Sequence, residues 1–169
     1  GTYVSNGALQ SAINSATAGD TILIGAGTYY VSNLTLSKAL NLISVAGPEK
    51  TILDVQGYTE NAFGDISGTA EKRGFKITNA GSAQDRITLS GFTIRNGYAN
   101  YGGAIYIENS FVILQNMILE DNIARYGAGI YATSLSEVKV DNVLFRRNSA
   151  KGSDVKMPGL SVSAYVNGG

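Results

Sequence analysis

The feature that most constrains the fold is a stretch of sequence that occurs three times between residues 87 and 157. The copies read ITLSGFTIRNGYANYGGAIYI, VILQNMILEDNIARYGAGIYA and VKVDNVLFRRNSAKGSDVKM. Leu89, Leu114 and Val140 hold equivalent places, at spacings of 25 and 26 residues. A fixed period of this size indicates stacked units, each of which buries its apolar face only against its neighbours. We therefore expect a single solenoid domain over residues 1–169.

Strands and one helix are expected around these copies. Short runs in which apolar and polar residues alternate, such as LTL and TILDV, place one set of side chains in a lumen and the other in solvent. They predict an all-β protein of about five to six coils. In residues 7–18, Leu9, Ile13 and Ala16 recur at helical spacing behind a possible N-cap, Asn6. This helix is expected to cover the first coil.

Residues 57–74 break the strand pattern. We expect them to loop out of a coil, and long loops on a rigid scaffold are common places for function. Tyr58 and Asp65 are the binding candidates that this loop supplies. The alternating C-terminal residues have no polar capping element after them, so we expect the chain to be cut from a longer solenoid.

Residues 9–47 resemble the entry segment of the pectin-lyase-like superfamily. The resemblance rests on a capping helix followed by Gly-Asp-Thr-Ile, then Gly-Thr-Tyr, then alternating strands. It implies a single-stranded, right-handed parallel β-helix. The superfamily contains lyases, hydrolases, esterases, phage tailspikes and non-catalytic adhesins, so the resemblance leaves the activity open.

Three asparagines follow the last apolar position of the three copies: Asn96, Asn122 and Asn148. Equivalent residues on neighbouring coils lie about 4.8 Å apart, so their amides are expected to form a structural ladder. A role in ligand binding is the alternative.

Charged residues also align between the copies. Arg95, Glu120 and Arg146 are expected to alternate in sign along one outer strip, where opposite charges on adjacent strands support the register. The functional alternative is a cluster of carboxylates and arginines that acts on an acidic sugar.

Tyrosines gather beside two glycine-rich segments of the repeats. Exposed tyrosines in a row are able to contact sugars or another protein; the alternative is that they only shield a corner of the coil and flank the strands. The candidates are Tyr98, Tyr101, Tyr106, Tyr126 and Tyr131.

Residues 92–157 carry a second, narrower resemblance. LEDN and FRRN are similar to the Phe-x-x-Asn motif, and GGAI at 102–105 matches the Gly-Gly-Ala-Ile motif, of chlamydial polymorphic outer-membrane proteins and similar adhesin-like surface proteins. The second copy departs from the pattern, with Gly-Ala-Gly at 127–129, and the third has Lys-Gly-Ser-Asp at 151–154. The resemblance implies a bacterial surface protein with a binding or scaffold role.

Composition narrows the chemistry. The chain has no His and no Cys, so the commonest general base and the thiolate metal ligands are missing. Its formal net charge is zero, which removes the electrostatic argument for a nucleic-acid partner, and no apolar run is long enough for membrane insertion. The carboxylates are not concentrated beside a basic residue as in a calcium-dependent lyase, so calcium is possible but not predicted.

We therefore expect an extracellular or cell-surface module that binds a host or neighbouring-cell protein or glycan without catalysis, or that serves as a stalk. No cofactor is expected. The alternative is a carbohydrate-active enzyme, such as a polysaccharide lyase, or a fragment of one.

Overall fold

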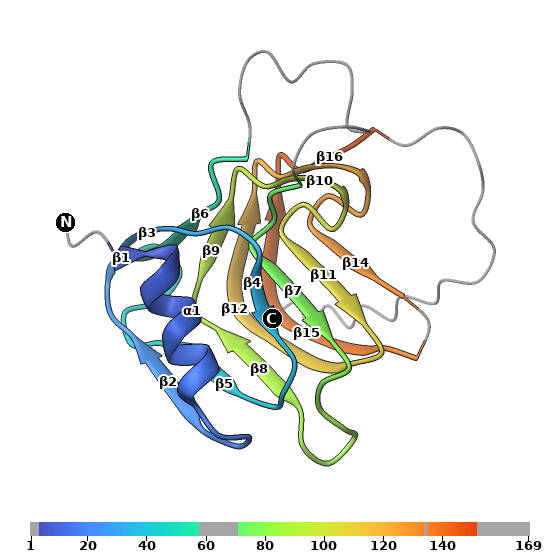
Figure 1. Cartoon of the computed structure of the whole chain (residues 1–169). Coiled ribbons are helices and arrows are strands. Elements are labelled where there is room, and N and C mark those ends of the chain that lie inside the picture. The colour runs from blue at the N-terminus through green and yellow to red at the C-terminus, as the bar shows by residue number, and fades with distance from the viewer. Residues whose placement is uncertain (1–3, 58–70, 134, 152–169) are drawn as a thin grey trace.

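The computed structural model describes residues 4–57, 71–133 and 135–151. These residues form a β-solenoid of about four turns with one short N-terminal helix (Figure 1). The predicted all-β fold of parallel coils with a helix at its start is confirmed. The five to six coils expected from the sequence become about four because the short strands before residue 87 share turns.

The described residues form one helix and sixteen strands. Their bounds are β1 Val4–Ser5, α1 Asn6–Ser15, β2 Thr21–Ile24, β3 Gly27–Tyr30, β4 Leu34–Leu36, β5 Asn41–Ser44, β6 Thr51–Asp54, β7 Phe75–Thr78, β8 Ile87–Ser90, β9 Thr93–Arg95, β10 Tyr98–Tyr101, β11 Ile105–Glu108, β12 Phe111–Glu120, β13 Ile123–Tyr126, β14 Ile130–Ala132, β15 Glu137–Arg146 and β16 Ser149–Ala150.

The strands form three parallel sheets that wrap around the lumen. The largest has the order β1-β3-β6-β9-β12-β8-β5-β2, with β15 added on β12. The other two have the orders β10-β13-β16 and β14-β11-β7-β4. β12 pairs with both β8 and β9 because it continues through a bend at Asn116, where φ is 52°. Gly91 holds the equivalent place between β8 and β9, with φ of 81°.

The observed register confirms the alignment of the repeats. Leu114 pairs with Leu89 on one side and with Val140 on the other. The same columns continue into the earlier coils, since Leu42 pairs with Leu89. Leu42, Leu89 and Leu114 are fully buried, so the aligned apolar positions form the walls of one continuous core.

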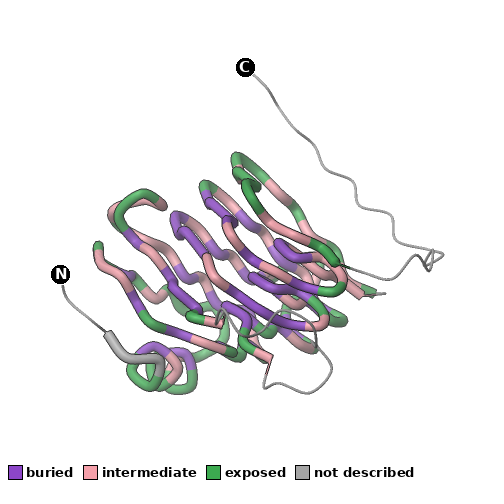
Figure 2. The backbone as a smooth tube through the Cα atoms, turned by 90° about the horizontal axis from the view of Figure 1, so that it is seen from above, coloured by how far each residue is buried: buried purple, intermediate pink, exposed green. Residues whose placement is uncertain are grey.

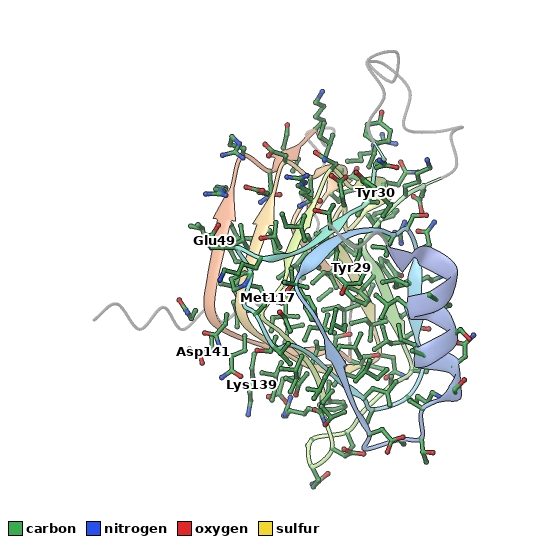
Figure 3. The ribbon with its side chains drawn as sticks, turned by 90° about the vertical axis from the view of Figure 1, so that its left-hand side faces the viewer. Tyr29, Tyr30, Glu49, Met117, Lys139 and Asp141 are labelled. Atoms are coloured by element: carbon green, nitrogen blue, oxygen red, sulfur yellow. The ribbon has the colours of Figure 1, made fainter. Side chains whose placement is uncertain are left out.

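Burial falls at the last described coil. Figure 2 shows buried positions concentrated in the middle coils and exposed ones along the outer turns. Phe145 continues the column of Ile94 and Leu119 but is 47% exposed, whereas those two are fully buried. Figure 3 shows Lys139 and Asp141 at the outer rim of the same coil. The core therefore has an open end at β15 within the described residues.

Helix α1 covers the first coil at the opposite end (Figure 1). Leu9 and Ile13 are buried against the core, as the helical spacing predicts. Gln10 forms two hydrogen bonds with the backbone of Thr35, accepting from its N–H at 2.8 Å and donating to its carbonyl at 3.1 Å. The helix ends at Ser15, earlier than the predicted residue 18, and Lys38 donates to the free carbonyl of Asn14 at 2.9 Å.

Candidate functional site

The candidate site is the corner at which β10 and β13 pass into β11 and β14 (Figure 1). Each passage turns through a glycine with positive φ, 65° at Gly102 and 60° at Gly127. A Cβ atom at Gly102 would overlap the carbonyl oxygen of Ile105. The glycines of the repeat are therefore required by the tight turn, and this turn brings the tyrosines of four strands together.

Four tyrosines form a continuous stack at this corner, hereafter the tyrosine corner. Tyr101 and Tyr126 lie in register on β10 and β13, with ring centroids 5.3 Å apart and planes 17° apart. Tyr106 and Tyr131 lie in register on β11 and β14, at 5.8 Å and 14°. Tyr101 also contacts Tyr131 at 4.8 Å with tilted planes, which joins the two pairs. The rings of each in-register pair face each other, and Tyr101, at 39%, is the most exposed member of the stack.

A guanidinium group lies at each end of the stack. The Cζ atom of Arg73 is 5.2 Å from the centroid of the Tyr106 ring, and that of Arg125 is 5.7 Å from the Tyr126 ring. Arg73 is buried and forms an ion pair with Glu71. Glu71 also accepts a hydrogen bond from the backbone N–H of Asn100 at 2.9 Å. These contacts hold the rings by cation–π attraction from both sides.

Sequence reasoning missed both arginines. Arg125 directly precedes Tyr126 in β13, and strand alternation would place the two side chains on opposite faces, so the pattern does not predict their contact. Arg73 belongs to the segment before β7, far from the repeats in sequence, and only the pairing of β7 with β11 brings it to Tyr106. No local sequence pattern predicts the contact between Arg73 and Tyr106.

Tyr106 has an additional polar contact. Its hydroxyl donates to the carboxylate of Glu108 at 3.3 Å. Partial burial, assisted by the negative charge of Glu108, raises the pKa of Tyr106 above its ordinary value. Tyr106 therefore remains a neutral hydrogen-bond donor at physiological pH.

The remaining predicted binding residues lie elsewhere. Tyr98 is 5% exposed, and its backbone pairs with Lys72 in an antiparallel bridge, so it adds nothing to the exposed surface of the corner. Tyr58 and Asp65 fall outside the described residues, as does most of the predicted loop at 57–74.

Two of the three predicted ladder asparagines are brought together. The Asn122 amide donates to the side-chain oxygen of Asn148 at 3.0 Å and to the carbonyl of Ile94 at 3.0 Å. Its own oxygen accepts from the backbone N–H of Gly97 at 2.9 Å. Asn96 precedes this column by one residue, has a φ of 60°, and bonds to Asp54 instead at 3.0 Å. The position equivalent to Asn122 is therefore Gly97.

The charged strip runs through four strands. In-register pairing aligns Asp54, Arg95, Glu120 and Arg146. Arg95 bonds to Asp54 at 2.9 Å, and Arg146 bonds to Glu120 at 2.5 Å. Both carboxylates have side chains only 8% exposed, so each buried negative charge has an arginine partner. The strip neutralises its own acids and leaves no free acid–base pair there.

The described surface also has two shallow hollows. One, of about 450 Å³, is lined by Ser44, Pro48, Asn116, Asn142 and Leu144 among others, and the second, of about 380 Å³, lies around Phe111 and Leu135. In residues 4–57, 71–133 and 135–151, no three acidic, His or Cys side chains converge as metal ligands. The described helix, with 10 residues, is too short to cross a membrane.

Comparison with known proteins found no matching family model, no matching curated protein and no matching solved structure.

Proposed function

We propose that this protein is a non-catalytic, adhesin-like binding module of an extracellular or cell-surface protein, and that the tyrosine corner contacts its partner. The observation that carries this proposal is the partly exposed stack of four tyrosines, held between two arginines on the wall of the solenoid. Tyrosine and arginine are enriched where proteins bind other proteins, because both combine apolar contact area with hydrogen-bond donors. The resemblances to pectin-lyase-like and polymorphic outer-membrane proteins agree with this role.

The ring arrangement favours a protein partner over a glycan. Sugars bind aromatic side chains by lying on a ring face, and the in-register rings here turn their faces to each other. The apolar ring edges and polar hydroxyls of tyrosine instead suit the mixed polar and apolar surface of a protein. The proposed partner is thus a protein on a host or neighbouring cell, and glycan binding is the competing outcome.

An enzymatic role has less support from the described residues. A lyase of this architecture needs acidic calcium ligands beside a basic residue that removes a proton. The buried carboxylates, Asp54 and Glu120, are already paired with arginines. The tyrosine corner offers hydroxyl groups but only the carboxylates of Glu71 and Glu108, each of which has a hydrogen-bond donor.

The test is a cell-binding assay with the labelled protein. A Tyr101→Ala/Tyr126→Ala variant is expected to lose binding, while Tyr30→Ala keeps it; Tyr30 is the matched control, at 38% exposure against 39% for Tyr101. Protease treatment of the cells is expected to abolish binding and glycosidase treatment to leave it. Equal binding by both variants would remove the tyrosine corner from the proposal, and the opposite treatment result would assign a glycan.

A second assay addresses the enzyme alternative. The protein is incubated with acidic polysaccharides and calcium while the absorbance of unsaturated uronates is followed. We expect no increase over a blank. A protein-dependent increase would overturn the non-catalytic assignment.

A further inference from the structure

We propose that the tyrosine corner is a site of oxidative cross-linking, at which a one-electron oxidant joins a tyrosine of one coil to a tyrosine of the next through a carbon–carbon bond between their rings. The proposal does not depend on the binding function. It concerns the rings themselves, and the modification would link β10 or β11 to β13 or β14 (Figure 1).

The geometry of the two stacked pairs supports this bond. Tyr101 and Tyr126 leave paired strands at the same register, as do Tyr106 and Tyr131, so both rings of a pair extend in the same direction. The planes of each pair are within 17° of parallel, so the two rings that carry the coupling carbons face each other. These carbons, beside the hydroxyl groups, carry much of the unpaired spin of a tyrosyl radical. The centroids are 5.3 and 5.8 Å apart, so the rings are neighbours before oxidation, and rotation of the side chains must close the remaining distance between the carbons.

The cluster is also accessible and connected. Tyr101 is 39% exposed, which lets an oxidant in solution reach it. Its 4.8 Å contact with Tyr131 links the two pairs, so a radical formed on one ring can pass to the others. Oxidation of a phenol releases its proton, and the carboxylate of Glu108 accepts the hydrogen bond of the Tyr106 hydroxyl. This carboxylate is placed to relay that proton to water.

The reaction balances with hydrogen peroxide as oxidant and a haem peroxidase as catalyst. Each of two tyrosines loses one electron and its phenolic proton. The two radicals couple at the ring carbons beside their oxygens, and the hydrogens on those carbons move as protons to the oxygens, which restores both phenols. The two electrons and two protons released reduce one peroxide molecule to two water molecules. The protein is left two hydrogen atoms lighter.

The sequence offers a direct readout of the site. Trypsin cuts after Arg95, Arg125 and Lys139, which places Tyr101 and Tyr106 in peptide 96–125 and the other two tyrosines of the cluster in peptide 126–139. Every cross-link between the two coils therefore joins these two peptides. Dityrosine also emits a blue fluorescence that separate tyrosines lack.

The experiment treats the dilute full chain with a haem peroxidase and hydrogen peroxide. We expect a monomer on a denaturing gel, the loss of two hydrogen atoms in the intact mass, dityrosine fluorescence, and peptide 96–125 linked to 126–139. The Tyr126→Phe/Tyr131→Phe variant keeps the stacked rings and is expected to lose this linked peptide completely. Tyr30→Phe serves as the control and is expected to cross-link like the unaltered chain.

Three outcomes would overturn the proposal. The first is the absence of the linked peptide from the unaltered chain, and the second is a product found only between two molecules. The third is loss of cross-linking in the Tyr30→Phe control. Far-UV circular dichroism and urea midpoints check that the double phenylalanine variant is folded. If that variant is misfolded, the single Tyr126→Phe and Tyr131→Phe variants decide: each is expected to form less of the linked peptide, and an undiminished yield in both would contradict the assignment.

Discussion

The coils before residue 79 and those after residue 86 enclose the same core with different sequence spacing. Leu42 and Leu89 are paired neighbours although 47 residues separate them, whereas Leu89, Leu114 and Val140 follow at 25 and 26. The apolar column is continuous through both regions. The difference shows that strand pairing, and not a constant period, builds the lumen; the period is visible only where the connecting loops keep one length.

The outer surfaces of the two regions differ more. The coils after residue 86 carry the tyrosine stack and the amide pair, each made by residues at repeated positions. The earlier coils contribute single partners to the later ones, such as Asp54 to Arg95 in the charged strip and Arg73 to Tyr106 in the tyrosine corner. Regular spacing thus lets like residues stack outside, while irregular spacing leaves individual contacts.

The largest expected effect tests whether the lumen is equivalent in the two regions. Leu42→Ala and Leu114→Ala each remove a fully buried side chain. Both are expected to lower the free energy of unfolding by about 2–5 kcal/mol, measured by urea titration with circular dichroism. Leu23→Ala, at a position 66% exposed, is the control and should change it by less than about 0.5 kcal/mol. A much smaller loss of unfolding free energy for Leu42→Ala than for Leu114→Ala would show that the core is not equally packed in the two regions.

The next effect concerns the turns. A Cβ atom at Gly97 would overlap the carbonyl oxygen of Gly103, so Gly97→Ala is expected to destabilise the later coils by about 3 kcal/mol. At Gly25, in the first coil, the same atom meets only the Tyr29 hydroxyl at 4.0 Å. Gly25→Ala should therefore be nearly neutral in thermal unfolding. Similar melting temperatures for the two variants would contradict the tighter turn in the later coils.

The amide pair should contribute less. Asn122 is fully buried, and Asn122→Ala leaves the Gly97 N–H and the Ile94 carbonyl without their partner. The expected loss of unfolding free energy is about 2 kcal/mol. Gln115→Ala removes an exposed 3.0 Å hydrogen bond to Asp141 between the same two coils and should cost less than about 0.5 kcal/mol. Equal losses in urea titrations would mean that burial does not matter at this ladder.

The smallest effect is a dependence on pH. The hydrogen bond from Arg147 holds the pKa of Asp121 below its ordinary value. Because the folded pKa is lower than the unfolded value of about 3.9, the stabilisation is complete above that pH and disappears as pH falls through the folded pKa. Asp121→Asn should thus have a lower urea midpoint than the unaltered chain at pH near 7, and the two midpoints should converge in acid. If the difference between the two urea midpoints grew in acid, the carboxylate of Asp121 would not stabilise the folded protein as proposed.

The sequence was sufficient for the columns of the core. Alternation marks Leu89 and Ile94 as inward residues, and the repeat aligns them with their neighbours on the next coil. The sequence did not predict which asparagines align, because Asn96 lies one residue before the column that Asn122 and Asn148 form. Asn96 shares its motif position with the two ladder asparagines only approximately, and its left-handed backbone moves it to Asp54.

The candidate site was only partly predictable. Spacing identified the four tyrosines that stack, since they repeat with the coils. It also included Tyr98, which has the same residue type but is buried beside the backbone of Lys72. The residue type alone does not predict whether a tyrosine at a corner is buried. The contact of Arg73 with Tyr106 depends on the pairing of β7 with β11, which are distant in sequence.

The stacked rings also have an optical consequence. The chain has 10 tyrosines and no tryptophan, so its ultraviolet emission comes from tyrosine alone. Rings less than 6 Å apart couple their electronic transitions, and the 54° tilt between Tyr101 and Tyr131, which lie on adjacent coils, gives the coupled transitions a circular dichroism signal in the near ultraviolet. The coupling lasts only while adjacent coils stay in register. The protein thus carries its own unlabelled reporter of coil pairing, placed at the surface where the proposed partner would bind.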